Sequence, residues 1–249
     1  MNELTTDIKK LEIETLDNLK MSKAKNTIRA YKSDFNDFSL FCSKHNMKSL
    51  PSHPKTVSLY LTHLSKSSKF STLKRRLASI NVMHKYKGHY LDTKHPIIVE
   101  NILGIKRQIG VYQKAKKPLL FNELKQVIDQ IDQSKESDYK KLRNKSLILV
   151  GFSGGFRRSE LVAITKDDIE FVKEGVKIFV KKSKSDQSGE GMIKAIPSFK
   201  FVKYCPVDHL RNWMFENKNE LVFPISDKNV ALIIKKYALK AGLDEKKYA

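Results

Sequence analysis

Apolar residues in the first part of the chain recur every three to four positions, which is the spacing of an amphipathic helix. Tyr31, Phe35, Phe38 and Cys42 form one such stripe, and Asn26 stands where a helix cap is expected. We interpret the aromatic residues of this stripe as core rather than as an exposed stacking surface. Nothing before residue 108 predicts a strand. Further helices are predicted from Val57, Tyr60, Leu61 and Leu64, from Leu73, Leu77, Ile80 and His84, and over about 97–107.

The second half of the chain mixes helical and strand periodicity. Residues 176–182 alternate apolar and polar side chains, and residues 192–197 form a returning apolar segment after a turn at 188–191. This pattern predicts an antiparallel hairpin among helices. The fold class is therefore mainly α with a small antiparallel β hairpin or sheet, an α+β protein. Helices are predicted at 121–133, 139–151, 206–217 and 227–242, with a helical turn continuing over 159–164 and an extended segment at 221–224.

A short basic stretch divides the chain near its middle. Residues 109–118 are weakly apolar and include Gly110, Lys116, Lys117 and Pro118, which is typical of a linker. We therefore expect a helical domain over 1–108 and a mixed domain over 119–249.

The net charge indicates a polyanionic partner. The chain carries 48 Lys and Arg against 27 Asp and Glu, a formal charge of +21. Residues 1–117 hold 23 basic and 9 acidic side chains, so the helical half carries most of the excess. Such an excess repels itself in the compact state, and nucleic acid is the simplest partner that compensates for it. A genome biased toward lysine is the alternative explanation.

The remaining composition disfavours secreted and membrane proteins. Cys42 and Cys205 are far apart and match no metal spacing, so we expect two buried free thiols and no metal or small-molecule cofactor. Residues 1–17 have no apolar core of a signal peptide, and no apolar run approaches the ~20 residues of a membrane helix. We expect a cytoplasmic, nucleoid-associated protein without a membrane partner.

One segment carries candidate chemistry. The run from Gly154 to Leu161, Gly-Gly-Phe-Arg-Arg-Ser-Glu-Leu, follows the apolar residues 146–152. It resembles the first catalytic box of the tyrosine recombinases, the phage-integrase family, which has the form Gly-x-Arg-x-Ser-Glu-Leu. The resemblance implies that Arg157 is the first catalytic arginine and that Glu160 orients it. A guanidinium fork suits the negative charge of a phosphoryl transition state. The alternative is an ordinary capping sequence with a surface ion pair.

Two further segments resemble the same family. Residues 182–191 are similar to its hairpin turn, which implies that Lys184 protonates the leaving 5′ oxygen; Lys181 and Lys182 are its close neighbours. Residues 27–42 and 71–84 resemble its helical, SAM-like core-binding domain, which implies a clamp around double-stranded DNA. The alternative for Lys184 is an ordinary exposed lysine in a turn. The alternative for the basic residues 74–76 is a solvated helix face without a phosphate contact. The residues expected to contact DNA are Lys74, Arg75, Arg76, Lys116, Lys117, Arg158 and Lys182.

The family pattern also requires a His-x-x-Arg box, a later His or Trp, and a nucleophilic tyrosine. His209-Leu210-Arg211 has the wrong spacing, Tyr237 lies on an apolar face, and Tyr248 precedes the expected position. Trp213 corresponds to a packing residue. We therefore expect a truncated gene product or a deliberately shortened chain that binds DNA but does not cleave and rejoin it alone.

The resulting hypothesis is a DNA-binding, tyrosine-class site-specific recombinase or integrase of a mobile element, whose activity in this chain is open. Self-association on DNA is an associated expectation. The alternative is a non-catalytic DNA-binding regulator, which has no need of Arg157, Glu160 and a lysine-tipped turn together. An RNA-binding protein is a third reading, but the sequence lacks the exposed aromatic sheet motif of that class.

Overall fold

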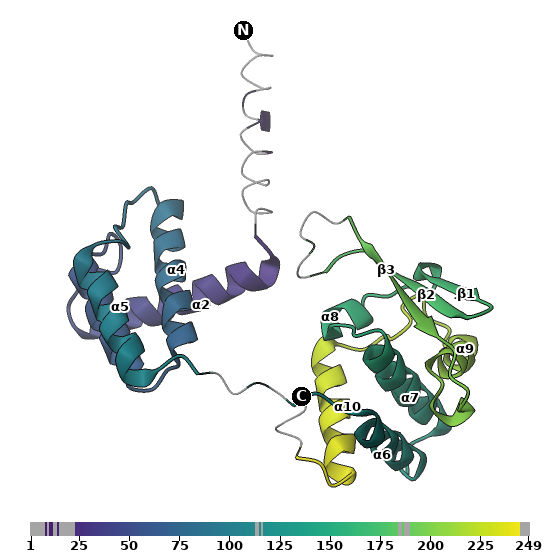
Figure 1. Ribbon diagram of the computed structural model, residues 1–249. Helices are drawn as coiled ribbons and strands as arrows, with labels where there is room; N and C mark the ends of the chain where they lie inside the picture. Colours follow the sequence, from purple (N-terminus) through teal and green to yellow (C-terminus); the bar gives the residue numbers. More distant parts are fainter. Residues whose placement is uncertain are drawn as a thin grey trace. The chain divides into compact units, whose positions relative to one another are not determined.

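The computed structural model describes residues 23–112, 115, 117–183, 186 and 190–244, together with residues 8, 10, 11 and 14. The chain divides into two compact units, Met1–Gln113 and Lys114–Ala249, called unit 1 and unit 2 below (Figure 1). Each unit has hydrophobic clusters of its own. None of the helices in the described ranges is long and apolar enough to cross a membrane.

Unit 1 contains the four predicted helices and, within its described residues, no strand. Helix α2 packs against α4, and α3 packs against α5. The expected apolar stripes form the core, with Phe38, Tyr60, Leu61, Leu73 and Ile80 almost fully buried. The helices are α2 (Lys25–Lys44), α3 (Pro54–Ser65), α4 (Phe70–Tyr86) and α5 (Pro96–Ile109).

The predicted cap of α2 is wrong. The helix begins at Lys25, so Asn26 lies inside its first turn and Ala24 is the capping residue, without a side-chain bond. The carbonyl of Ala24 accepts the first hydrogen bonds, from the amides of Thr27 at 2.8 Å and Ile28 at 3.1 Å. The start of α2 is thus set by backbone bonding, whereas α3 and α5 each begin at a proline preceded by a capping histidine.

A buried carboxylate joins α2 to α4. The side chain of Asp34 is 3% exposed and pairs with Arg75 and, through Nε at 3.2 Å, with Arg76. Its Oδ2 also accepts a 2.8 Å hydrogen bond from the hydroxyl of Ser79. Arg76 forms a second ion pair with Asp37 at 2.6 Å. Because a buried charge is tolerated only when paired and hydrogen-bonded, this network fixes the two helices against each other.

Unit 2 is mixed, as predicted, but its sheet has three strands instead of two. Strand β1 precedes the expected hairpin and pairs with β2 antiparallel, Ile169 opposite Ile178. Gly175, at the start of β2, lies so close to β3 that a Cβ would be 2.1 Å from the carbonyl oxygen of Ile196. The strands are β1 (Ile169–Val172), β2 (Gly175–Val180) and β3 (Met192–Pro197), in that order.

Helix α7 lies at the centre of unit 2, beside α6 and α9 (Figure 1). Its residues Leu147 and Val150 pack into the cluster that contains the sheet and Trp213, and Ile148 and Leu149 pack into the cluster with α6 and α10. Burial on both sides explains why α7 ends in a nearly continuous apolar run. The helices are α6 (Phe121–Asp132), α7 (Asp138–Ser153), α8 (Arg158–Leu161), α9 (Pro206–Glu216) and α10 (Asp227–Lys240), with 3₁₀ turns η1 (Lys166–Asp168) and η2 (Val202–Tyr204).

Several predicted core residues are confirmed. Tyr237 and Trp213 are fully buried, and the indole of Trp213 donates a 2.6 Å hydrogen bond to the carbonyl of Val222. Cys42 and Cys205 are buried free thiols. These side chains therefore belong to the packing of the two units.

Candidate functional site

The candidate site begins in the turn that follows α7. Gly155 has φ of +56°, a left-handed conformation that favours glycine. A Cβ on Gly154 would lie 2.2 Å from a ring carbon of Phe156, so a side chain does not fit there while Phe156 keeps its position. The two glycines let the chain reverse sharply, and Arg157 then stands at the start of α8.

Glu160 holds Arg157 at two points. Its Oε2 accepts a 3.0 Å hydrogen bond from the Arg157 backbone amide, and its Oε1 accepts one of 2.7 Å from Nη1 of the same residue. The Glu160 side chain is 2% exposed, whereas that of Arg157 is 48% exposed. Glu160 therefore caps α8, as the alternative interpretation expected, and it also holds the guanidinium, with a carboxylate that is buried and not at the surface.

The electrostatics of Glu160 follow from these contacts. Burial alone would raise its pKa, because the charged form loses water. The bonds from the Arg157 amide, the Arg157 guanidinium and the Ser183 hydroxyl outweigh burial, with Lys194 adding to them, and they lower the pKa of Glu160 to about 2. Glu160 is thus ionised at neutral pH, and its carboxylate retains the hydrogen bonds and the ion pair with Arg157.

The β2–β3 connection reaches the same carboxylate. The hydroxyl of Ser183 donates a 2.7 Å hydrogen bond to Oε1 of Glu160 and accepts one from Nη1 of Arg157. The predicted hairpin therefore lies beside the predicted arginine. Lys184 lies outside the described residues. Lys182 is exposed, and Lys181 is engaged elsewhere, in a 2.8 Å ion pair with Asp168.

Lys194 is a site residue that sequence reasoning missed. It lies on β3, and its Nζ donates hydrogen bonds to the carbonyls of Gly154 at 3.0 Å and Gly155 at 2.9 Å. The same nitrogen is 3.6 Å from Oε2 of Glu160 and 4.4 Å from the ring centre of Phe156. In sequence it is one lysine among many, and only its position in a strand expected near the hairpin offered a signal.

Three other predicted DNA contacts are Arg158, Lys116 and Lys117. Arg158 is exposed and lines a largely apolar hollow of about 320 Å³ with Phe152, Phe156 and Ile234. Lys117 forms a 2.7 Å ion pair with Glu123, and Lys116 lies outside the described residues.

The basic run on α4 is divided between surface and interior. Lys74 is exposed, and Arg75 is 46% exposed while paired with Asp34. Arg76 is only 19% exposed and is held by Asp34, Asp37 and the hydroxyl of Tyr60. Arg76 is therefore mainly part of the α2–α4 packing, in contrast to the exposed cation that the sequence suggested.

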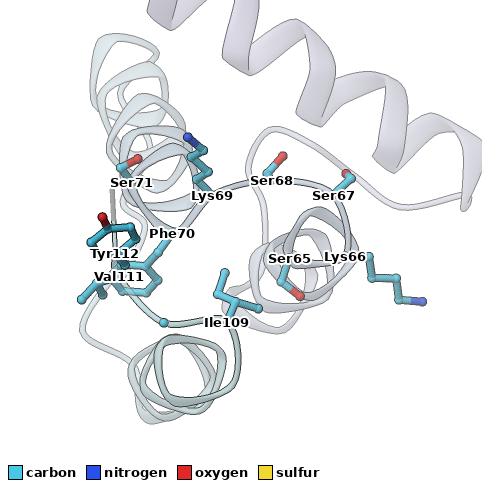
Figure 2. A pocket seen from close by; sticks show the side chains of 11 residues that line it. Ser65, Lys66, Ser67, Ser68, Lys69, Phe70, Ser71, Ile109, Val111 and Tyr112 are labelled. Atoms are coloured by element: carbon cyan, nitrogen blue, oxygen red, sulfur yellow. The ribbon is translucent and has the colours of Figure 1, made fainter. Parts of the chain in front are cut away.

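A polar hollow in unit 1 offers other cations. It measures about 330 Å³ and lies between the α3–α4 loop and the residues that follow α5. Figure 2 shows Ser67, Ser68, Lys69 and Ser71 along one rim. Lys66 and Lys69 form no ion pair within the described part of the chain. The sequence also carries no Asp or Glu between Asp37 and Asp92, so no carboxylate of this long segment competes for an anion here.

Comparison with known proteins decides the family. Residues 117–248 match the phage integrase family, and residues 15–89 match the N-terminal SAM-like domain of phage integrases. The chain belongs to the phage integrase family. This integrase-family chain is 37% identical over 257 residues to an integrase/recombinase XerD homolog from Selenomonas ruminantium, an alignment covering 96% of the chain and 74% of the relative. It is 26% identical over 209 residues to a tyrosine recombinase of Thermosipho africanus, covering 81% and 68%.

Solved structures show the same fold for the integrase-family chain. A lambda integrase tetramer bound to a Holliday junction matches with a TM-score of 0.58, at 15% identity, over 93% of this chain and 63% of that one. The XerH site-specific recombinase in a post-cleavage complex with a palindromic difH substrate matches with a TM-score of 0.51, at 15% identity, over 77% and 54%. The chain thus spans little more than half of the XerH chain. The predicted family and the predicted α+β fold class are confirmed.

Proposed function

We propose that this protein binds double-stranded DNA and that Arg157 contacts a phosphodiester in the site-specific recombination reaction of tyrosine recombinases. The observation that carries the proposal is the half-exposed guanidinium of Arg157, fixed from behind by the buried carboxylate of Glu160. A preorganised guanidinium stabilises the charge that develops on non-bridging phosphate oxygens without reorganising during the reaction. A carboxylate behind it fixes its direction.

The family's chemistry assigns roles around this arginine. A tyrosine oxygen forms a bond to the phosphorus as the bond to the 5′ oxygen breaks, giving a 3′-phosphotyrosyl intermediate and a 5′ hydroxyl. Lys184 is proposed to give its proton to the departing 5′ oxygen. Arg157 neutralises the phosphoryl oxygens, and Glu160 positions Arg157.

Three tyrosines of unit 2 are described, and each is engaged in packing or hydrogen bonding, whereas Tyr248 lies outside the described residues. Tyr237 is fully buried, Tyr139 packs against Trp213, and the hydroxyl of Tyr204 donates to Asp129. For the 249-residue chain we propose DNA binding without covalent cleavage by these described tyrosines.

Unit 1 supplies the proposed contacts with the DNA backbone. Its exposed cations Lys66, Lys69 and Lys74 lie in the carboxylate-free segment, and ammonium and hydroxyl groups are the usual partners of phosphate oxygens. The XerH and lambda integrase structures are complexes with DNA, and the latter is a tetramer, which supports duplex DNA as partner and self-association on it.

Fluorescence anisotropy with a labelled 40-base-pair duplex of mixed sequence tests DNA binding by the 249-residue chain. We expect affinity to fall steeply with salt, because displaced counterions drive the association. Arg157→Ala is expected to weaken binding about fivefold, the size of an exposed charge contact, and Arg157→Lys less. Arg211→Ala, which removes an exposed arginine resting on the ring of Phe171, is the matched control. Equal affinities for Arg157→Ala and the wild type would remove Arg157 from the interface and favour the regulator.

A nicked suicide duplex tests the absence of cleavage. The 249-residue chain is expected to leave no protein–DNA adduct that survives denaturation. A covalent adduct would show that a tyrosine of this chain reaches the phosphate and would overturn that part of the proposal.

A further inference from the structure

Lys194 is one of the less exposed lysines of unit 2, and its ammonium is largely withdrawn from water. The side chain is 18% exposed, whereas Lys177 on the neighbouring strand is 45% exposed and pairs with an exposed glutamate. Withdrawing a charge from water is unfavourable unless the protein supplies partners. The location of those partners therefore indicates what the residue does.

Among the described residues, the polar partners of the Lys194 ammonium all belong to the segment that presents Arg157. Two are the carbonyls of Gly154 and Gly155, at 3.0 and 2.9 Å, in the sharp turn immediately before the arginine. The third is Oε2 of Glu160, at 3.6 Å, the oxygen that also accepts the Arg157 amide. One ammonium thus ties β3 to both ends of the arginine turn.

The ionic balance of the cluster gives Lys194 a second consequence. Glu160 and Arg157 alone form a neutral pair, which attracts an anion weakly. With Lys194 beside the same carboxylate, the cluster of two cations and one anion carries a net charge of +1. The half-exposed member of this cluster is Arg157, so the excess charge is available on the solvent side. Such a balance suits a phosphodiester, which carries one negative charge.

We propose that Lys194 is a positioning residue for Arg157, which holds the glycine turn and offsets the charge of Glu160 so that the guanidinium remains available to a phosphodiester. The proposal rests on the proposed function for the identity of the anion. The tether itself is a property of the protein without DNA. In the described contacts, Lys194 does not bond to the Nη atoms of Arg157. The proposal also places no contact between Lys194 and the phosphate.

Three substitutions separate the tether from the charge. Lys194→Arg keeps both a charge and donors, Lys194→Gln keeps amide donors without the charge, and Lys194→Met removes both. Lys177→Met, on the adjacent strand, is the matched loss of one charge. Thermal unfolding followed by Trp213 fluorescence, since Trp213 is the single tryptophan, identifies any variant that does not fold.

The first measurement is the ¹⁵N–¹H resonance of the Arg157 Nε–H group, assigned by its loss in Arg157→Lys. We expect it to shift and broaden in Lys194→Met, to be largely restored in Lys194→Arg, and to be unchanged in Lys177→Met. An unchanged resonance in folded Lys194→Met and Lys194→Gln would overturn the positioning role.

The second measurement is affinity for the 40-base-pair duplex. Lys194→Gln is expected to bind about fivefold more weakly even where its melting temperature matches the wild type, as for loss of one exposed charge interaction. Combining it with Arg157→Ala should add little, because both changes disable the same interaction with phosphate. Wild-type affinity in folded Lys194→Gln would refute the charge-offset part.

The two proposals fail separately. If Arg157→Ala leaves DNA affinity unchanged while Lys194→Met still alters the Arg157 resonance, the proposed DNA contact is wrong and the tether stands. If Arg157→Ala weakens binding and the Lys194 variants change neither measurement, the role of Lys194 is wrong and the DNA contact stands.

Discussion

Asp34 on α2 pairs with Arg75 on α4 although the carboxylate is 3% exposed and the arginine side chain is 46% exposed. The combination of a buried acid and a half-exposed guanidinium also occurs at Glu160 and Arg157. In unit 1 the acid additionally joins two helices, through Arg76 and Ser79. Its removal should therefore affect stability before it affects any ligand.

Asp34→Asn is expected to lower the free energy of unfolding of unit 1 by about 2 kcal/mol, because it removes the buried charged acceptor that Arg75, Arg76 and Ser79 share. Urea unfolding followed by circular dichroism reports on both units, and Trp213 fluorescence reports on unit 2 alone. Only the circular dichroism transition should move. Asp37→Asn, at a carboxylate 47% exposed, is the control and should cost less than about 1 kcal/mol. A similar cost for the two variants would contradict the structural role of burial.

Glu160 should make unit 2 sensitive to acid. Its pKa is lowered to about 2 in the folded protein from an ordinary value of 4.5. Its contribution is therefore complete above pH 4.5 and disappears as the pH falls from 4.5 toward 2. Glu160→Gln should be about 2–3 kcal/mol less stable than wild type at pH 7, and the difference should shrink toward pH 2.5. Trp213 fluorescence in urea measures this difference. The exposed Glu170→Gln should track the wild type, and a constant difference for Glu160→Gln across this range would disprove the assignment.

His84 should make unit 1 sensitive to mild acid. Its Nε2 accepts a 2.9 Å hydrogen bond from the Ser52 amide, and its Nδ1, 2.8 Å from the carbonyl of Ile80, donates to that carbonyl. Only the bond from Ser52 requires the neutral ring, because a protonated Nε2 has no lone pair to accept with. Burial lowers the pKa of His84, with the Ile80 carbonyl opposing and the charge of His89 assisting. The unfolded state then takes up the proton first, and stability declines as the pH falls below about 6.5.

His84→Leu tests this dependence. We expect a loss of about 1–2 kcal/mol at pH 8, because the Ser52 amide loses its partner. Between pH 8 and 5.5 the variant should lose less stability than the wild type, as measured by circular dichroism in urea. The exposed His63→Leu should keep the wild-type pH dependence. Parallel pH profiles for wild type and His84→Leu would show that another group titrates.

The lysines that line the polar hollow of unit 1 should contribute to the salt dependence of DNA binding. Replacing Lys66 and Lys69 with Gln is expected to reduce the slope of log affinity against log salt by about one unit for each phosphate that the variant no longer neutralises. Lys218 and Lys228 of unit 2, replaced together, remove the same charge elsewhere. Equal slope changes for the two double variants would mean that only the total charge matters.

Much of the fold was predictable because its signal is local. The stripes at Phe38 and Leu73 identify helices of unit 1, and the alternation at 176–180 identifies β2. Strand β1 was missed because it has four residues and depends on its pairing with β2. The start of α2 was misplaced because Ala24 closes the first turn through its carbonyl, which leaves no side-chain signature.

The candidate site divides in the same way. Arg157 and Glu160 are three positions apart, so a motif can carry them. Lys194 acts on carbonyls about 40 positions away, and carbonyls are present at every residue, so no sequence pattern marks the contact. Arg76 was placed on the surface because its partners Asp34 and Asp37 lie on another helix.

The separate hydrophobic clusters of the two units have a consequence for affinity. Each unit is built around hydrophobic clusters of its own residues. If both units bind DNA, engagement of one raises the effective concentration of the other at the duplex, commonly to the millimolar range for short linkers. Cleaving the chain near residue 114 would then remove this gain, and each fragment would bind DNA only with its own, weaker affinity.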